Sequence, residues 1–391
     1  MRHSPADVRE LARIVAAAAS ARAALSICAG ASKQSLRASP ADAAVLDISR
    51  LAGIVDYQPT ELVLTARAAT PLEQIEKELD RHNQMLAFEP ADWRGLLASE
   101  DRYQTLGGVM ACNLSGPRRI VAGAARDHFL GVEAVNGRGD TFKAGGKVVK
   151  NVTGYDLCKV LAGSFGTLAI MTELTLKVLP RPESTVSVVR SGLTDAEAVR
   201  LMTAALNSVH QVSAAAHLPA AVSSNSQATT VFRLEGSRPS LMARCRALCR
   251  ELSGDFIEEQ ESRTLWAAVR DVAPFIARQG PVWRLAVPPA DACRITDRIA
   301  RSLSCSWFYD WGGGLVWLLI DPTVPEGGVE VIRAAVSKDG HATLLRAPAN
   351  LRGRVPTFQP LPAQLARLNA RVRQAFDANG VFNHGFSSAR S

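Results

Sequence analysis

The segment Gly163–Pro180, GSFGTLAIMTELTLKVLP, places two glycines directly before a long run of β-branched and apolar residues that a proline ends. Such a run predicts a buried strand, because β-branched side chains favour extended backbone and proline cannot continue a hydrogen-bonded ladder. Glycines before a strand serve either a tight turn or a backbone that must lie close to a ligand. The segment therefore predicts a rigid strand with a small-residue loop at its head, and other segments must decide what the loop does.

The first 182 residues alternate between strand and helix patterns. ALSICAG, AVLDIS, ELVLTARAA and MLAFEP are typical of short strands, and TPLEQIEKELDRHN repeats apolar residues at helical spacing. FLGVEAVNGRGDTFKA predicts a hairpin that turns at residues 136–140. Because PRP at 180–182 ends this block, we expect a first domain over residues 1–182.

From residue 185 the pattern changes to strand, helix, strand, strand, helix, and a similar run follows. We expect an α+β domain over residues 183–346, in which helices cover one face of an antiparallel sheet. Residues 347–391 predict an amphipathic helix, with an apolar face from Leu365 to Phe376, followed by the tail FDANGVFNHGF. We expect this last part to pack back on the first domain.

Three loops of the first block share a small-residue pattern, namely Ala29–Ser32, Gly107–Gly108 and Gly163–Thr167. Each lies at a strand end or a helix start, where unpaired backbone N–H groups converge and favour phosphate. The chain has no G-x-x-x-x-G-K-[ST] motif and no G-x-G-x-x-G after its first strand, which argues against a P-loop and a nicotinamide-binding Rossmann domain. A large ligand with a central pyrophosphate fits three separated loops better.

The charge of the chain suits an anionic ligand or an acidic partner. Its 45 Lys+Arg and 37 Asp+Glu give a formal net charge of +8, without any basic run of five or more residues. Nucleic-acid surfaces cluster such residues, so we expect no nucleic-acid partner. The seven cysteines include no C-x-x-C pair, which predicts no metal site or iron–sulfur cluster in this chain and favours a reducing, cytoplasmic compartment. No run approaches the ~18 apolar residues of a membrane span, so we expect no direct membrane insertion.

Several stretches occur in an order and spacing that resemble a known family: ICAGASK, EPADW with TLGGVMACNLSGPRR, ARDHFLGVEAVNGRGDTFKAGGKVVKNVTGYDL, and GSFGTLAIMTELTLKVLP. They resemble the p-cresol methylhydroxylase-type FAD-binding fold. Through WGGGLVW, DGHATLLRA and the tail, the chain is similar nearly end to end to the FAD-binding subunits of bacterial glycolate oxidase, also called glycolate dehydrogenase. The resemblance implies a two-part FAD-binding domain, an α+β cap domain, and a C-terminal helix and tail that return to the FAD domain.

The same resemblance implies non-covalent FAD and a place in a multi-subunit enzyme that oxidises glycolate, a 2-hydroxy acid, to glyoxylate. It implies two partners, a sister FAD-containing catalytic subunit and an iron–sulfur subunit, through which the chain would lie peripheral to the inner membrane. In this interpretation the sister subunit performs hydride transfer, and the present chain relays electrons or organises the complex.

The resemblance also assigns FAD-contacting residues to this sequence. The loop Cys28–Lys33 would wrap the pyrophosphate, and Pro90 with Thr105–Gly108 would line the isoalloxazine and ribityl region. The backbone of Gly163–Ile170 would lie against the adenine half or the ring edge, held by the strand that follows, and Asn383 would reach the flavin from the tail. The full set is Cys28, Ala29, Gly30, Ala31, Ser32, Lys33, Pro90, Thr105, Leu106, Gly107, Gly108, Asn113, Ser115, Gly116, Gly163, Ser164, Gly166, Thr167, Ile170 and Asn383.

Two departures from the family pattern concern the cofactor site. The pyrophosphate loop has Ala29 and Ala31, where the family usually has more glycine, and His384 stands where the tail commonly has proline. Because alanine disfavours positive φ, we expect this loop to differ in shape or to bind FAD less tightly. The loop contains no histidine, so a covalent flavin link there is not expected.

Whether this chain oxidises a substrate itself stays open, because hydride transfer from a 2-hydroxy acid needs a base for the hydroxyl proton and a cation for the carboxylate. Distant catalytic relatives pair two histidines at a metal, whereas GHATLLRA offers only His341. A stand-alone dehydrogenase would hold the carboxylate with Arg118, Arg119 or Lys150. Its base would be Tyr155 or His341. A non-enzymatic scaffold that has lost FAD is the third hypothesis.

Overall fold

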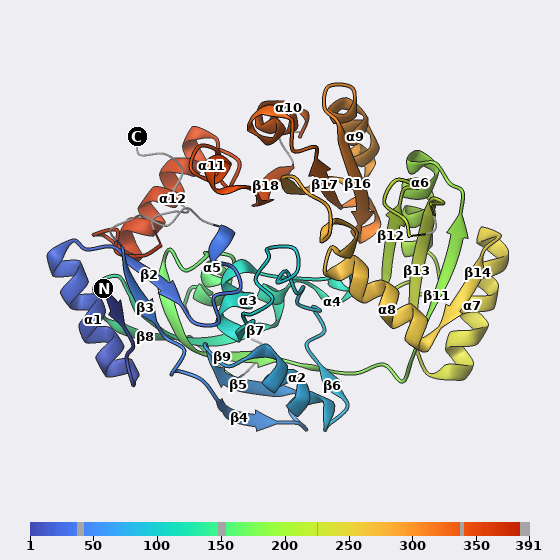
Figure 1. The fold of residues 1–391 in the computed structure, drawn as a ribbon. Coiled ribbons are helices and arrows are strands. Elements are labelled where there is room, and N and C mark those ends of the chain that lie inside the picture. The colour runs from blue at the N-terminus through green and yellow to red at the C-terminus, as the bar shows by residue number, and fades with distance from the viewer. Residues whose placement is uncertain (37–42, 148–153, 225, 337–339, 384–391) are drawn as a thin grey trace.

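The computed structural model describes residues 1–36, 43–147, 154–224, 226–336 and 340–383, and it has an α+β architecture (Figure 1). Two smaller sheets from the N-terminal half lie at the lower left of Figure 1, and one large sheet with its helices lies at the upper right. The C-terminal helix α12 returns to the left, near the N-terminal strands and α1. No helix of the described residues is long and apolar enough to cross a membrane.

A three-stranded parallel sheet begins the chain. Its strands have the order β1-β3-β2, and helix α1 packs against it through the buried side chains of Leu11 and Val15. Asp7 caps α1, since its side chain accepts a hydrogen bond from the backbone N–H of Glu10 at 2.8 Å. The bounds are β1 Arg2–His3, α1 Val8–Ala21, β2 Leu25–Cys28, the 3-10 helix η1 Gln34–Leu36 and β3 Ala44–Asp47.

A five-stranded antiparallel sheet follows, with the order β4-β5-β9-β7-β8. The strand predicted within the 163–180 segment is its central strand, β9, which pairs with β5 on one side and with β7 on the other. The predicted hairpin is confirmed, since Val135 pairs with Thr141 across the turn between β7 and β8. The bounds are β4 Ile54–Gln58, β5 Val63–Arg67, β7 Phe129–Asn136, β8 Thr141–Gly145 and β9 Ala169–Lys177.

Short helices and a two-stranded ladder complete the N-terminal half. Helix α2 buries Leu72, Ile75 and Leu79, the apolar face that its helical spacing predicts. The ladder pairs β6 with β10 at the end of this half of the chain. The bounds are α2 Leu72–Asp80, β6 Gln84–Met85, α3 Leu106–Cys112, α4 Arg119–Ala122, η2 Ala125–His128, α5 Leu157–Leu161 and β10 Leu179–Pro180.

Residues Ser184 to Arg346 build an eight-stranded sheet with the order β14-β11-β13-β12-β16-β17-β15-β18, in which neighbouring strands pair antiparallel, as the repeated pattern predicts. Its strands are β11 Ser184–Ser191, β12 Ala214–Leu218, β13 Thr229–Gly236, β14 Asp255–Glu258, β15 Val282–Ala286, β16 Cys305–Asp310, β17 Leu315–Ile320 and β18 His341–Arg346. Its helical segments are α6 Asp195–Leu206, α7 Arg238–Leu252, α8 Glu259–Arg270, η3 Ala273–Phe275, η4 Pro289–Asp291, α9 Ala292–Ala300, η5 Trp311–Gly313, η6 Pro325–Gly328 and α10 Val329–Ala335.

The two faces of the large sheet bury different cores. One face, with Trp283, packs against α6, α7, α9 and α10. The other face, with Trp317, shares one continuous core with the five-stranded sheet of the N-terminal half. Helix α8 lies on this second face, where the indole N–H of Trp266 donates to Ser187 Oγ at 2.8 Å. The expectation that helices cover one face is thus corrected, because the apolar side of α8 joins the core shared between the halves.

The end of the chain returns to the first sheet. The backbone N–H of Leu25 in β2 donates to the carbonyl of Val381 at 2.8 Å, and Leu25 forms a bridge with Phe382. Asp377 holds the turn before this contact, since its carboxylate accepts from the N–H groups of Val381 and Phe382, each at 2.8 Å. The bounds of the last helices are α11 Ala349–Arg352 and α12 Ala363–Phe376.

Candidate functional site: a cleft between the two small sheets

A cleft opens where the three-stranded sheet, the five-stranded sheet and the C-terminal tail meet. It holds about 840 Å³ of space, counting the part that is open to solvent. The loop after β2, the start of α3, the turn before β9 and Asn383 of the tail all line it. Segments far apart in the sequence thus share one cavity, and the three small-residue loops converge there.

The structure brings part of the predicted set together in this cleft. The predicted residues that line it are Cys28, Ala29, Gly30, Ala31, Ser32, Lys33, Thr105, Gly107, Gly108, Gly166, Ile170 and Asn383. The predicted residues that do not line it are Pro90, Leu106, Asn113, Ser115, Gly116, Gly163, Ser164 and Thr167. The cleft defines a place for a ligand, while the assignment of each residue to FAD stays a prediction.

Sequence reasoning missed part of the lining. Ala111 and Cys112 follow Gly107 and Gly108 by one turn of α3, so the helical period from the glycine pair would have pointed to them. The others carry no local signal, because only the packing of separate sheets places them at the cleft. The missed residues are Ile27, Gln34, Leu36, Ile48, Ala68, Ala111, Cys112, Phe165, Ala169 and Met171.

The loop after β2 contains a left-handed residue in spite of its alanines. Ala31 has a φ of +59°, a region that glycine tolerates better than alanine does. Gly30 is required for another reason, since a Cβ there would lie 2.0 Å from the carbonyl oxygen of Tyr103. Ala31 therefore carries backbone strain of about 1 kcal/mol, while the expected difference of this loop from the family pattern stays a prediction.

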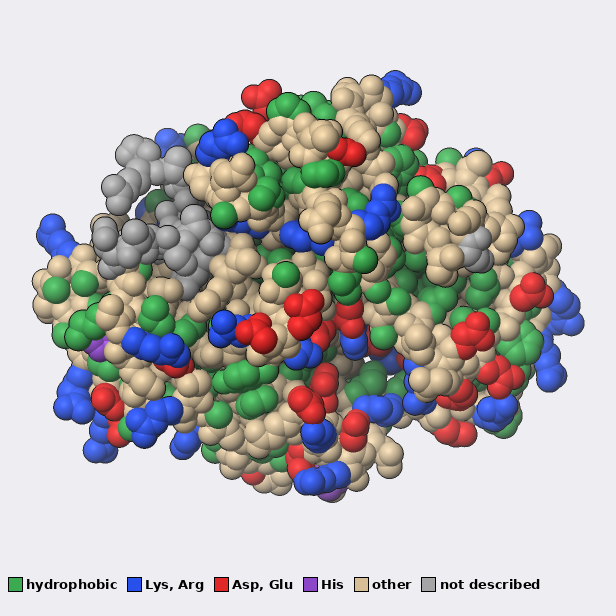
Figure 2. Space-filling view, in the orientation of Figure 1, with side chains coloured by type: hydrophobic (Ala, Val, Ile, Leu, Met, Phe, Trp, Pro, Cys, Tyr) green, Lys and Arg blue, Asp and Glu red, His purple; other side chains and the backbone are tan. Residues whose placement is uncertain are grey.

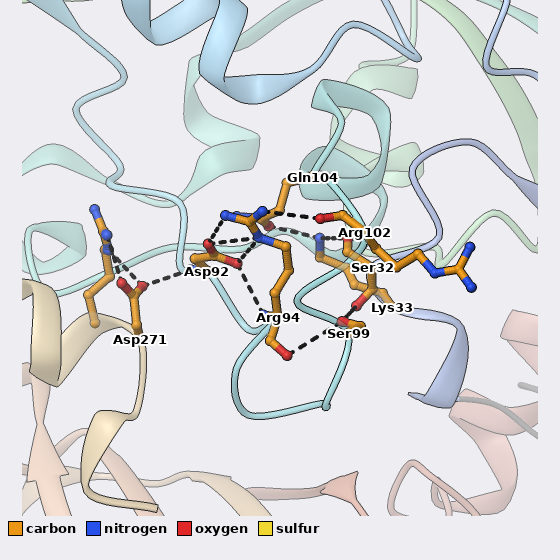
Figure 3. A network of polar contacts seen from close by, with 9 residues as sticks. Ser32, Lys33, Asp92, Arg94, Ser99, Arg102, Gln104 and Asp271 are labelled. Carbon is orange, nitrogen blue, oxygen red and sulfur yellow. Dashed lines mark hydrogen bonds and ion pairs between the residues drawn. The ribbon is translucent and has the colours of Figure 1, made fainter. Parts of the chain in front are cut away.

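Lys33 adds a cation to the same loop (Figure 3). Its ammonium donates to Gln104 Oε1 at 2.8 Å and to Ser32 Oγ at 3.1 Å, both neutral groups. Loss of water around the ammonium lowers the pKa of Lys33 below its ordinary value. A phosphate oxygen in the cleft would supply a countercharge and oppose that shift, so Lys33 fits the pyrophosphate part of FAD.

Polar contacts connect this loop to the end of α8, as Figure 3 shows. The Ser99 hydroxyl donates to the carbonyl of Ser32 at 3.0 Å. Arg94, nearby in the same segment, pairs with Asp92 at 2.7 Å. Asp271, directly after α8, accepts from the backbone N–H of Asp92 at 2.7 Å. The segment that carries Asp92 and Ser99 thus connects the loop to Asp271, a residue of the second half of the chain.

The glycines just before β9 allow both a tight turn and a close contact between the backbone and Asn383. Gly163 and Gly166 have φ of +82° and +68°, and the backbone N–H of Phe165 between them donates to α3 at 2.8 Å. A Cβ on Gly166 would lie 2.8 Å from the side-chain nitrogen of Asn383. Asn383 donates to the carbonyl of Phe165 at 3.0 Å and accepts from the N–H of Ile27 at 3.1 Å. Asn383 therefore clamps β2 to this turn at the cleft.

Arg118 lies elsewhere, in a charged hollow between β6 and α8. Figure 2 shows side chains of both charges around this hollow. The Arg118 guanidinium pairs with Glu235 at 2.5 Å, and Glu89 accepts from Arg233 at 2.8 and 3.0 Å. Burial alone would raise the pKa of Glu89, but the charges and hydrogen bonds of Arg233 and Arg118 together outweigh burial, so this pKa lies below its ordinary value. Arg118 is therefore already neutralised by a partner inside the protein.

The side chains of Arg119 and Arg284 lie over the indole ring of Trp311, on the face of the large sheet that shares a core with the N-terminal half. Their guanidinium carbons lie 4.3 and 5.1 Å from the ring centroid of Trp311. Burial lowers the pKa of both, to about 10 for Arg284, and neither forms an ion pair with a described residue. Burial also raises the pKa of the neighbouring Asp310 to about 7. Sequence reasoning missed Arg284, because one arginine within the strand VWRLAVP gives no sign of its surroundings.

The proposed bases lie apart from one another. Tyr155 is 90% exposed and does not line the cleft. His341 is partly buried on β18, where its ring lies 6.4 Å from that of Phe358, which is 4.8 Å from the ring of Phe165 at the cleft. Burial lowers the pKa of His341, which favours the neutral ring that can accept a proton. Lys150 lies outside the described residues.

The cysteines and histidines of the described residues form no metal centre, since no group of three His, Cys, Asp or Glu side chains there could hold an ion. Cys112 lines the cleft, and burial raises the pKa of its thiol to about 11, so the thiol is protonated at neutral pH. The lining thus consists mainly of backbone, small or apolar side chains and one ammonium group.

The fold and the cleft agree with a known class of domain. Residues 3–145 match the family model described as FAD binding domain. The whole fold resembles the solved alkyldihydroxyacetonephosphate synthase with a TM-score of 0.69 and 14% identity, over 97% of this chain and 76% of that one. At that identity the likeness shows the fold alone. The chain therefore has an α+β fold that contains an FAD-binding domain.

Relatives in sequence are more specific. The chain is 34% identical over 357 residues to glycolate oxidase subunit GlcE of Escherichia coli K12. The aligned stretch covers 91% of this chain and 90% of that protein. It is also 42% identical to glycolate oxidase subunit GlcD of Bacillus subtilis 168 over 86 residues. This stretch covers 22% of this chain and 18% of that protein. The chain belongs to the GlcE family of glycolate oxidase subunits.

Proposed function

We propose that this chain is the FAD-binding subunit of a glycolate oxidase, which oxidises glycolate, a 2-hydroxy acid, to glyoxylate. The convergence of the loop after β2, the start of α3, the Gly166 turn and Asn383 on one cleft carries the proposal. Similarity to GlcE over nearly the whole chain supports it. When bound, FAD supplies a carrier that takes up electrons or passes them on.

FAD would bind non-covalently, with its pyrophosphate against the loop after β2. Lys33 would provide the countercharge, and Gln104 would hold the ammonium in place. Asn383 and Gly166 would form the opposite wall. Gly107 would keep α3 against β5, because a Cβ there would lie 2.9 Å from the side chain of Ala68. These residues bind and orient the cofactor.

The chain would divide its work among three parts. Residues 1–182 would form a two-part p-cresol methylhydroxylase-type FAD-binding domain from the two small sheets. Residues 183–346 would form the cap domain, whose inner face shares a core with the first domain. Residues 347–391 would return the tail to the FAD domain, and the hydrogen bonds of Leu25 and Asn383 support this assignment.

Within the complex, this subunit would relay electrons or organise the assembly, while a sister flavin subunit performs hydride transfer and an iron–sulfur subunit takes part in electron transfer. The pairing of Arg118 with Glu235 and the exposure of Tyr155 support this division, because both candidates for substrate chemistry are then unsuited to it. The chain would work on the cytoplasmic side, peripheral to the inner membrane through its partners.

A stand-alone 2-hydroxy-acid dehydrogenase is the second candidate, and one observation favours it. Arg119 and Arg284 bring two positive charges to Trp311 without an ion pair among the described residues. His341, on the strand next to Arg284, is held neutral by burial. The two arginines would bind the substrate carboxylate, and the neutral ring of His341 would accept the hydroxyl proton.

Flavin spectroscopy distinguishes these functions. The purified chain is expected to be yellow and to release FAD on denaturation. Anaerobic glycolate is expected to bleach the flavin only when the sister subunit is present. Bleaching of the isolated chain that is lost in Arg284→Met would favour the stand-alone dehydrogenase. A colourless protein that FAD cannot reconstitute would favour the scaffold that has lost FAD.

A further inference from the structure

Helix α12 has an apolar face that its own chain covers at one end. At the C-terminal end, Val372 and Phe376 pack against the core of the N-terminal half, and the ring of Phe376 lies 6.0 Å from that of Phe142. Leu365 and Leu368 continue the same face toward the N-terminal end, yet they are 51% and 53% exposed. The face is continuous, so its bare half is available to a partner.

A third exposed leucine lies just outside the helix. Leu361, just before the helix, is 41% exposed. Leu361, Leu365 and Leu368 form what we call the leucine stripe. Leu365 and Leu368 lie one turn apart on the helix, the i, i+3 spacing by which a helix enters an apolar groove of another protein, and Leu361 precedes them in the segment before the helix. One exposed leucine needs no explanation, but three exposed leucines within residues 361–368 mark an interaction surface.

The surroundings of the leucine stripe are basic. Residues 361–376 contain three arginines and no aspartate or glutamate. Arg367, Arg371 and Arg373 lie on α12 itself, and none of them forms an ion pair with a described carboxylate. A complementary surface would therefore present an apolar groove with carboxylates along its rim.

We propose that the leucine stripe docks into an acidic-rimmed apolar groove on another subunit of the glycolate oxidase complex. This inference rests on the proposed function, because it needs a partner subunit. A membrane surface is the less favoured occupant, since α12 exposes no aromatic anchor and its bare apolar face is short. The stripe thus gives this chain a defined point of attachment.

Two double variants test the surface. Leu365→Glu with Leu368→Glu places two charges in the stripe, and Ala363→Glu with Ala370→Glu places two charges on the other side of α12, where both alanines are exposed. Each is co-expressed with the partner subunits and recovered by a tag on this chain. Wild type and the alanine-site control are expected to retain the complex, and the leucine-site variant to weaken it by at least about tenfold. The isolated variants should keep their FAD content and melting temperature.

The remaining outcomes overturn the proposal. An undiminished complex in the leucine-site variant removes the stripe from the interface. A lower melting temperature of that isolated variant shows that the leucines pack within this chain. Flotation of the isolated wild type with phosphatidylglycerol–phosphatidylethanolamine vesicles, lost in a leucine-site variant that still forms the complex, assigns the surface to a membrane. Failure of the proposed function is distinct, because the wild-type chain itself then yields no complex or no flavin.

Discussion

At the residue scale, Ala31 and Lys33 in the loop after β2 show how a loop that lines the cleft departs from what stability alone would select. Lys33 places a positive charge among neutral partners, Gln104 and Ser32, in surroundings that lower its pKa. Ala31 holds a backbone conformation that suits glycine. The charge of Lys33 suits an anion, and the conformation of Ala31 leaves strain that the rest of the fold must offset.

Lys33→Met should weaken FAD binding by about 10- to 100-fold, because it removes a charge-assisted hydrogen bond worth about 1.5–3 kcal/mol. Titration of the apo-protein with FAD, followed by quenching of flavin fluorescence, measures the change. Lys77→Met is the matched control, since Lys77 is exposed and pairs with Glu73 on α2. Equal affinities for wild type and Lys33→Met would remove Lys33 from the site.

Ala31→Gly should raise the free energy of unfolding by about 1 kcal/mol, because glycine adopts the positive φ of Ala31 without the Cβ penalty. Urea unfolding of the two proteins under identical conditions measures the difference. Ala16→Gly, within helix α1, should have the opposite sign. A destabilised Ala31→Gly protein would contradict the strained geometry of the loop.

At the element scale, the returning tail depends on one buried carboxylate. Asp377 accepts hydrogen bonds from the N–H groups of Val381 and Phe382, which orients the tail along β2. The approach is close, since a Cβ on Gly137 would lie 2.3 Å from Asp377. This turn thereby determines where Asn383 meets the cleft.

Asp377→Ala should destabilise the protein by about 3 kcal/mol, because two buried N–H groups lose a charged acceptor. It should also weaken FAD binding, since Asn383 loses its fixed position. Thermal unfolding and flavin titration measure the two effects. Asp101→Ala serves as the control, because the Asp101 side chain is 73% exposed. Unchanged stability in Asp377→Ala would show that the tail holds its place without this turn.

At the scale of the whole molecule, a buried charge network fastens the large sheet to the N-terminal half. Glu89 lies between β6 and α3, whereas its partner Arg233 belongs to β13 and is only 4% exposed. Asp271 adds a second connection through the backbone of Asp92. A buried ion pair is costly to break from one side, because the remaining charge is left without a partner.

Glu89→Gln should destabilise the protein by about 3 kcal/mol at pH 7, since the buried Arg233 loses its closer carboxylate and keeps Glu235 at 3.8 Å, which also pairs with Arg118. The pKa of Glu89 is lowered in the folded state, so its contribution is present above the unfolded pKa, near 4.3, and is lost as the pH falls through the lower folded value. The gap between wild type and variant should therefore shrink below about pH 4. Urea unfolding across pH measures it, with Glu73→Gln as the exposed control. A gap that does not depend on pH would contradict this role of the charge.

Local patterns were sufficient for several elements. The apolar face of α2, the hairpin between β7 and β8 and the strand β9 follow from residues near one another in the chain. Helix α8 was not predicted from the sequence. Its pattern would not have shown its position either, because its apolar side has the same spacing whichever face of the sheet receives it. Gln104 and Arg284 were missed for the same reason, since their neighbours come from distant segments.

The motifs of the sequence, by their order and spacing, indicated a family resemblance. The sequence by itself also determined which segments extend or coil and where small residues leave the backbone bare. These properties depend on backbone preference and on periodicity, which act over a few residues. Only the tertiary structure decided that the bare segments share a cleft, that Arg118 is neutralised by Glu235 and that the leucine stripe stays uncovered. Those outcomes depend on contacts between parts of the chain far apart in sequence, and no local preference specifies them.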